Sequence, residues 1–279
     1  MNLIGIDLDG TLLTDKGTLS TYTKETIQAV CEKGHKVVIA TGRHLRLTMP
    51  IVEELKLVEA VVCFNGAYIQ TPDKQVPSKH SYRAQDIGVL VNLLNEWSCK
   101  YVIGAESGYF LPTTLSEEKE KRAGLPVPIQ LIENIAEIDE PIFKTSILGT
   151  EKELEKVERN IEAVIPELRV VRSGEDSLDV IHPKASKGSS LAWLAEYYDI
   201  SQQDTIAFGN YYNDVDMLSF ARVGVAMKNA PLPIKQSADY VTKRNEEDGV
   251  AFVLDQLFLQ SKGKRYDFLE KMNMQKSIS

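Results

Sequence analysis

The first 80 residues alternate short apolar runs with longer helical segments, and this alternation constrains the fold more than any other feature. Apolar runs of this length, closed by turn residues, are typical of buried strands. Ser20 is a good cap for a first helix and Gly34 a good stop. A strand–helix–strand order predicts a parallel sheet with crossover helices. The expected strands are residues 3–6, 36–40 and 60–64, with helices at 20–33 and 45–55.

The alternation stops near residue 82 and resumes after Lys187. The intervening residues contain an expected helix at 84–97, a charged helix at 151–164, and strands at 101–104, 109–111, 143–148, 169–172 and 177–181. After Lys187 we expect helices at 189–198 and 214–220 and strands at 205–208, 223–226 and 240–241. The sequence therefore predicts an α/β protein with a Rossmann-like parallel sheet. Its core (1–81 and 184–279) is interrupted by an α+β cap domain (82–183).

Polar side chains gather where the expected core strands end. Asp7 and Asp9 follow the first strand, Thr41 follows the second, and Lys187 begins the helix after the insertion. Parallel strands end at one edge of a sheet, which is where ligands bind in open α/β folds. Two carboxylates side by side need a cation or a shared proton. Together with the amide-rich segment 209–214, this inventory suits phosphoryl transfer, where positioning and charge neutralisation dominate.

Composition narrows the function classes. The net charge is −8 and the pI about 5.2, which argues against general nucleic-acid binding. No apolar stretch approaches the roughly 18 residues of a membrane span, and no signal peptide is evident. The three cysteines form no CxxC pair, and the histidines have no metal-ligand spacing. We expect a cytoplasmic protein without nucleic-acid or membrane partners, and either a monomer or a homodimer.

At the level of motifs, the chain resembles the haloacid dehalogenase-like (HAD) superfamily. The resemblance is closest to its Cof-type phosphatases, which carry a large cap between motifs II and III. It extends from Leu3 to about Phe258. Two further segments, Phe64-Asn65-Gly66-Ala67 and His182-Pro183-Lys184, also match that subgroup. The four motifs are Asp7-Leu8-Asp9-Gly10-Thr11, Ala40-Thr41-Gly42-Arg43, Lys187-Gly188 and Gly209-xxx-Asn213-Asp214.

The resemblance implies a role for each motif residue. Asp7 would be the nucleophile that forms an aspartyl-phosphate, and Asp9 would be the general acid and base. Thr41, Gly42, Lys187 and Asn213 would bind the phosphate. Mg²⁺ would be the cofactor, held by Asp7, the backbone carbonyl of Asp9, Asn210 and Asp214. The implied partner is a small phosphorylated metabolite, such as a sugar phosphate or a nucleotide-like phosphate.

One position departs from the family pattern. The family usually has Gly-Asp where this chain has Gly209-Asn210, so the site loses one negative charge. The amide oxygen of Asn210 is still a hard ligand, but Mg²⁺ affinity should fall. This position leaves open a catalytically weak phospho-ligand-binding or regulatory protein as an alternative to a phosphatase. The resemblance leaves open a second alternative, a phosphomutase, because some capped relatives move phosphate within a sugar.

Two further regions yield weaker expectations. The cap offers polar candidates for substrate contacts, but none has a distinguishing pattern: Glu106, Tyr109, Arg122 and Lys144. The basic tail at 262–279 is expected to be a partly helical, solvated segment.

Overall fold

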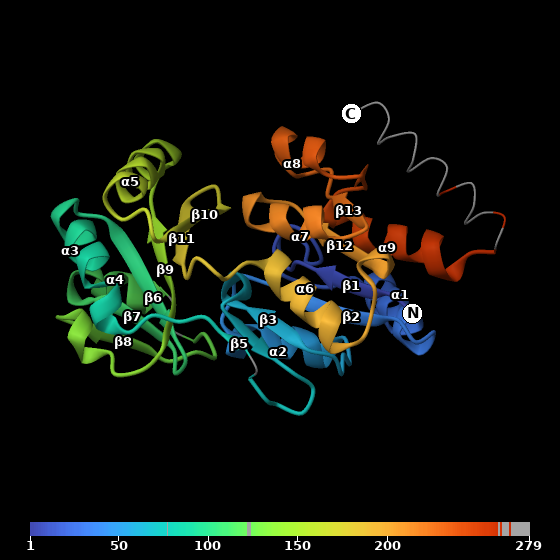
Figure 1. The fold of residues 1–279 in the computed structure, drawn as a ribbon, viewed down its shortest axis with the longest axis horizontal. Coiled ribbons are helices and arrows are strands. Elements are labelled where there is room, and N and C mark those ends of the chain that lie inside the picture. Colours follow the sequence, from blue (N-terminus) through green and yellow to red (C-terminus); the bar gives the residue numbers. More distant parts are fainter. Residues whose placement is uncertain (77, 122–123, 262, 264–267, 269–279) are drawn as a thin grey trace.

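The computed structural model describes residues 1–76, 78–121, 124–261, 263 and 268. These residues form two lobes, one from the two ends of the chain and one from its middle, as the colours in Figure 1 show. Each lobe is built on its own sheet. The arrangement confirms the predicted α/β class. The exact domain boundaries at 81/82 and 183/184 remain a prediction.

The first sheet has eight strands in the order β14-β13-β12-β1-β2-β3-β4-β5. All pairs from β14 to β3 are parallel, and β4 and β5 are antiparallel additions at the edge. The carboxyl ends of β1, β2 and β12 therefore meet at one edge of the sheet. The strands are β1 (Leu3–Ile6), β2 (Lys36–Ala40), β3 (Val61–Cys63), β4 (Tyr68–Gln70), β5 (Ser78–Lys79), β12 (Thr205–Gly209), β13 (Val223–Ala226) and β14 (Tyr240–Val241).

Helices cover both faces of this sheet, because alternate strand residues point to opposite sides. Ile4 belongs to a buried cluster with Ile27 of α1 and Val253 of α9. Leu3 belongs to a second cluster with Leu191 of α6. The helices are α1 (Thr21–Glu32), α2 (Leu45–Glu54), α6 (Lys187–Tyr197), α7 (Val215–Phe220), α8 (Leu232–Ser237) and α9 (Gly249–Leu254).

The second sheet has the order β10-β11-β9-β6-β7-β8, and only β7 and β8 run parallel. Helices α3 and α5 bury their apolar stripes on one face, with Leu94 and Leu154 in the same cluster as Val180. The other face packs against the first lobe, where Phe143 of β9 stacks on Phe64 with ring centroids 5.1 Å apart. The elements are α3 (Gly88–Glu96), α4 (Ser116–Lys121), α5 (Glu151–Val164), β6 (Lys100–Ala105), β7 (Tyr109–Pro112), β8 (Ile129–Ile132), β9 (Ile142–Leu148), β10 (Arg169–Gly174) and β11 (Ser177–Ile181).

Several expected elements differ from the structure at their ends; the helix expected at 189–198 begins at Lys187, and the strand expected at 169–172 extends to Gly174. The helix expected at 84–97 is divided into a single 3₁₀ turn, Ala84–Asp86, and α3. The strand expected at 60–64 ends at Cys63, because Phe64, Asn65 and Gly66 have φ angles of 50°, 55° and 98°. Several short elements of the structure have no counterpart among the expected ones: β4, β5, β8, α4 and α9.

The expected basic tail lies outside the described residues, except for Gly263 and Phe268. Within the described ranges, no helix combines the length and apolar character that crossing a membrane requires.

Candidate active site

A cavity of about 580 Å³ lies where the carboxyl ends of the parallel strands face the second sheet. Asp7 and Asn210 follow β1 and β12, and Gly42 follows β2. The opposite wall comes from the second sheet, with Tyr109 and Lys144 among its residues. Side chains from both lobes therefore enclose one space, as the sheet topology predicts.

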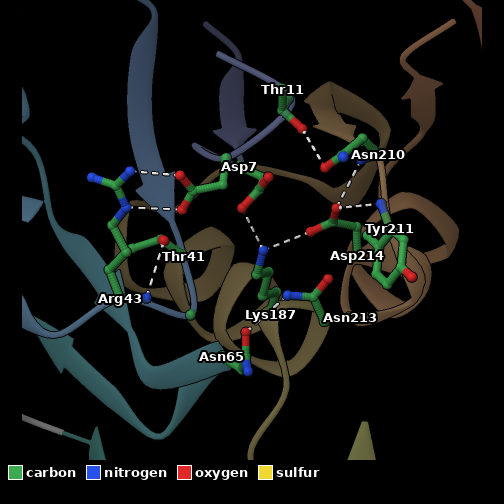
Figure 2. Close-up of polar contacts among 12 residues, drawn as sticks. Asp7, Thr11, Thr41, Arg43, Asn65, Lys187, Asn210, Tyr211, Asn213 and Asp214 are labelled. Carbon is green, nitrogen blue, oxygen red and sulfur yellow. Dashed lines mark hydrogen bonds and ion pairs between the residues drawn. The ribbon is translucent and has the colours of Figure 1, made fainter. Parts of the chain in front are cut away.

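Lys187 is the fully buried centre of the charge network beneath this cavity (Figure 2). Ser186 caps α6 and so sets the helix start at Lys187, with its Oγ accepting a hydrogen bond from Ser189 N at 2.9 Å. The Lys187 Nζ donates to Asp7 Oδ1 and to Asp214 Oδ1, each at 2.6 Å. A buried ammonium is stable only when it is paired in this way.

Two carboxylates share this one ammonium, which leaves the buried site with excess negative charge. Burial raises the pKa of Asp7 to about 7; Asp214 adds to the rise, and Lys187 opposes it. For Lys187, burial disfavours the charge, but Asp214 and Asp7 outweigh it and raise its pKa above the ordinary value. A further cation beside Asp7 would favour its ionised form.

Asp9 lies two residues after Asp7 but has a different cationic partner. Arg43 Nε and Nη2 donate to Asp9 Oδ2 and Oδ1 at 2.8 and 2.5 Å. Both acids line the cavity, as expected, but Asp7 is buried while the Asp9 side chain is 60% exposed. Gly10 forms the turn after Asp9 with φ +72°, where a Cβ would lie 2.4 Å from Asn210 Nδ2.

The expected phosphate ligands occupy different depths. Thr41 is buried, and its Oγ1 accepts a hydrogen bond from Arg43 N at 3.2 Å. The cavity wall beside it is formed by Gly42 and Arg43. Asn213 also lines the cavity, and its Nδ2 donates to Asn65 Oδ1 at 3.0 Å.

Both oxygens of the fully buried Asp214 carboxylate accept hydrogen bonds from the protein. Oδ1 binds Lys187, and Oδ2 accepts from the backbone N–H groups of Asn210 and Tyr211 at 2.8 and 3.0 Å. This arrangement anchors both Lys187 and the loop after β12. It makes Asp214 a support for the site more than a direct metal ligand.

The side chain of Asn210 lies between the two other candidate ligands of a magnesium ion, Asp7 and the Asp9 carbonyl. Its terminal amide atom lies 3.0 Å from Asp9 O and Thr11 Oγ1, and 3.3 Å from Asp7 Oδ2. With nitrogen in that place, the amide donates to all three oxygens. With oxygen there, this atom is a hard donor 3.0 Å from Asp9 O and 3.3 Å from Asp7 Oδ2, near the spacing of about 2.9 Å between neighbouring ligands of an octahedral Mg²⁺. The donor set therefore fits Mg²⁺.

This set differs from a site built on acidic side chains alone. Among the described residues, no three His, Cys, Asp or Glu side chains are grouped to hold a metal ion. The candidate ligands here are one carboxylate, one backbone carbonyl and one amide. The ligands of a cation at this place would carry less negative charge than those of a site with two carboxylates.

Several cavity residues had no role in the sequence analysis. Tyr109 and Lys144 were only undistinguished candidates, yet both line the cavity; Arg122 lies outside the described residues. Asp179 was not predicted to have a role. The sequence did contain a signal for it, since this acidic residue interrupts the apolar run of β11, where it is buried. The other lining residues without a predicted role include Asp15, Arg43, Ser173, Glu175, Ser177, Tyr211, Asn229 and Arg244.

Comparison with known proteins gives a consistent result. A family model described as haloacid dehalogenase-like hydrolase matches residues 4–254. Stress response protein YhaX of Bacillus subtilis is 29% identical, with 98% of each chain covered. The 5-amino-6-(5-phospho-D-ribitylamino)uracil phosphatase YitU of the same organism is 31% identical over 92% of this chain and 97% of its own. A crystal structure of a haloacid dehalogenase-like hydrolase from Bacteroides thetaiotaomicron has a TM-score of 0.80 at 29% identity, covering 92% of this chain and 99% of that one.

Proposed function

The chain belongs to the haloacid dehalogenase-like hydrolase family and is a phosphoric monoester hydrolase, and from this premise we propose its reaction. It hydrolyses small phosphorylated metabolites through an aspartyl-phosphate on Asp7, with Mg²⁺ as cofactor. The observation that carries this proposal is the buried contact between Asp7 Oδ1 and Lys187 Nζ at the floor of the cavity.

In the first half-reaction, an Asp7 carboxylate oxygen attacks the phosphorus atom. A new O–P bond forms on Asp7 while the bond between phosphorus and the substrate oxygen breaks. Asp9, which for this step has left Arg43 and carries a proton, gives that proton to the departing alkoxide. Lys187 holds the nucleophile in place and offsets charge on the phosphoryl group, a task that suits a compact ammonium.

In the second half-reaction, Asp9 accepts a proton from water as that water attacks the phosphorus. The bond between Asp7 and phosphorus breaks, which releases inorganic phosphate and restores both carboxyl groups to their starting states. Gly42 and Asn213, which line the cavity, bind the phosphoryl oxygens, with Thr41 supporting them from below.

Asp7, the Asp9 carbonyl and Asn210 would hold Mg²⁺, with Asp214 fixing the loop that carries Asn210. When bound, the ion supplies positive charge that brings the anionic nucleophile and the anionic phosphate together. Asn210 contributes a neutral oxygen, so this chain relies more on Lys187 for charge compensation than a relative with aspartate there would.

The substrate is a small molecule, because the second sheet covers the cavity and leaves about 580 Å³. Lys144 and Tyr109 face the space from that sheet and would contact the leaving group. The phosphatase YitU, a relative of this chain, is named for a phosphorylated ribitylaminouracil. A phosphorylated sugar or sugar-like alcohol is the substrate class we propose.

The proposal is tested by assaying phosphate release from phosphorylated metabolites and from an aryl phosphate, with Mg²⁺ and with a chelator. We expect Mg²⁺-dependent release by the wild-type protein and none by Asp7→Asn. Turnover that survives in Asp7→Asn would overturn the nucleophile assignment. Binding without turnover in the wild type would favour a phospho-ligand-binding protein, which the neutral Asn210 also suits. Isomerisation of a sugar phosphate without phosphate release would indicate a phosphomutase.

A further inference from the structure

Asn65 connects the second sheet to the phosphate end of the cavity through both ends of its amide. Its Nδ2 donates to Asp179 Oδ2 on β11 at 2.7 Å. Its Oδ1 accepts from Asn213 Nδ2 at 3.0 Å, and Figure 2 shows these two amides beside Lys187. Asn65 and Asp179 are each 1% exposed. We call Asp179, Asn65 and Asn213 the amide relay.

The backbone that carries Asn65 is held in a costly conformation. Phe64 has a φ angle of 50°, in a left-handed region that bulky residues rarely adopt, and Asn65 follows at 55°, which asparagine tolerates better. Hydrogen bonds from Phe64 N to Arg43 O and from Asn65 N to Thr41 O fix the turn against the phosphate motif. Such strain persists where the surroundings over-determine it, and it concentrates at functional sites.

Asp179 determines which end of each amide faces its neighbour. Its Oδ1 accepts from Ser146 Oγ at 2.7 Å, and its Oδ2 forms an ion pair with Lys144 Nζ at 3.1 Å. A carboxylate paired with lysine only accepts hydrogen bonds, so Asn65 must turn its nitrogen toward it. The oxygen of Asn65 then faces Asn213, and Asn213 must donate a hydrogen bond to it from its own nitrogen.

We propose that Asp179 and Asn65 are positioning residues that orient Asn213 so that it presents an N–H group to the phosphoryl oxygens. This inference rests on the proposed function of the site. An amide nitrogen carries two hydrogens, and Asn65 takes one of them. The second serves the phosphate. Without the relay, Asn213 is free to present its oxygen, which would repel an anionic ligand.

The relay also links phosphate binding to the position of the second sheet. Asp179 and Lys144 lie on neighbouring strands β11 and β9, and Lys144 Nζ also donates to Gly42 O at 2.9 Å. Two cap side chains therefore contact adjacent parts of the phosphate site. Asn213 has its correct orientation only when this sheet is seated over the cavity, so binding and enclosure occur together.

A double-mutant cycle tests the relay in the full-length protein. Asn65→Gly removes the amide while tolerating the left-handed backbone, and Asn213→Ala removes the expected donor. The dissociation constant of inorganic phosphate is measured by calorimetry with Mg²⁺, and KM and kcat with an aryl phosphate. We expect each single variant to weaken phosphate binding roughly tenfold, the effect of one hydrogen bond to a charged group. The double variant should bind no more weakly than either single variant.

Two outcomes of this cycle would contradict the amide relay. If the two effects multiply to about a hundredfold, or if Asn213→Ala binds phosphate normally, the relay is wrong. Asp179→Ala, which removes the acceptor that fixes the nitrogen of Asn65, should also weaken binding in the wild-type background and have no further effect when Asn65 is Gly. Should Asn65→Gly fail to fold, the cycle of Asp179→Ala with Asn213→Ala gives the same test.

Ser190→Ala is the matched control, since it removes a hydrogen bond to Gly66 O in the same turn without touching either amide. It should leave phosphate binding unchanged, and a loss equal to that of Asn65→Gly would reduce Asn65 to a structural role. Failure of the proposed function looks different. A wild-type protein that releases no phosphate overturns the reaction, while the binding cycle still decides the relay.

Discussion

Arg43 and Asp9 form a two-pronged ion pair across the mouth of the cavity, with Nε–Oδ2 and Nη2–Oδ1 distances of 2.8 and 2.5 Å. The planar guanidinium matches the carboxylate, which a lysine would not do. Asp9 outweighs the effect of burial and raises the pKa of Arg43. The proposed acid and base is thus held by one fixed cation before substrate arrives.

Replacing Arg43 tests whether this pair orients Asp9 or stabilises the fold. We expect Arg43→Gln to change the free energy of unfolding by less than about 1 kcal/mol, because the Asp9 side chain is 60% exposed. The value of kcat/KM should fall roughly tenfold, since Asp9 loses its fixed orientation. Urea unfolding and steady-state kinetics measure both, with Lys24→Gln in the exposed pair with Glu54 as control. Lost stability with normal turnover would contradict the prediction.

Asp9→Asn tests whether Asp9 acts as the general acid while Asp7 acts as the nucleophile. Loss of a general acid should lower kcat about 10²- to 10⁴-fold for an alkyl phosphate, whose leaving group needs a proton. The loss should be smaller for an aryl phosphate, whose leaving group departs more readily as an anion. Comparing kcat for both substrates in wild type and variant is the measurement. Equal losses would argue against the acid role.

Asn210→Asp should tighten Mg²⁺ binding by roughly tenfold or more, because it adds a charge beside Asp7 Oδ2 in a partly buried site. The same charge should lower the stability of the metal-free protein. Calorimetric titration with Mg²⁺ gives the first quantity and thermal unfolding without metal the second. Asn160→Asp on α5 adds the same charge elsewhere. Unchanged or weaker Mg²⁺ binding by Asn210→Asp would sink the assignment of this residue as a ligand.

Gly66 is required by the turn that carries Asn65. Its φ is +98°, and a Cβ there would lie 2.2 Å from Ser186 O. We expect Gly66→Ala to lower the free energy of unfolding by more than about 2 kcal/mol, from strain and the displaced backbone. Gly17→Ala is the matched control, with φ +73° and no atom within 4 Å of the new Cβ. It should cost about 1 kcal/mol, from strain alone. Equal losses would contradict this account.

His44 should make the fold sensitive to acid. Burial lowers its pKa from the ordinary 6.5, and Arg46 adds to that effect. The unfolded chain then binds more protons just below pH 6.5, so stability falls as the pH falls. In the wild type, Arg46 N donates to His44 Nδ1 at 3.0 Å, and His44→Asn keeps an acceptor for this N–H group. Unfolding free energies at pH 7.5 and 5.5 should differ less in the variant, and equal differences would exclude His44 as the cause.

Much of the fold was readable from the sequence because its elements have strong local signals. Helix α5 and strands β2, β11, β13 and β14 begin and end where their patterns predict. Short strands such as β4 were missed because pairing with a neighbouring strand, here β3, decides whether three residues are a strand. Three residues are too short a pattern to predict that pairing.

Some contacts of the site residues could be predicted from the sequence, and others could not. Strand ends and helix starts predicted that Asp7, Lys187 and Asn210 would meet, because parallel strands finish at one edge. The sequence did not predict the partner of Asp9, since Arg43 reaches it across two loops. It also gave Asp179 no role, although that residue lies 2.7 Å from Asn65.

By itself, then, the sequence determined the α/β class, the edge at which the chemistry lies and the residue types available there. These properties follow from the local periodicity of each element and from the order of the elements along the chain. Only the tertiary structure decided which charges pair, how deeply each is buried and which way the amides of Asn65 and Asn213 face. Those properties depend on contacts across more than 100 residues of chain, where Asp179 meets Asn65 and Lys187 meets Asp7.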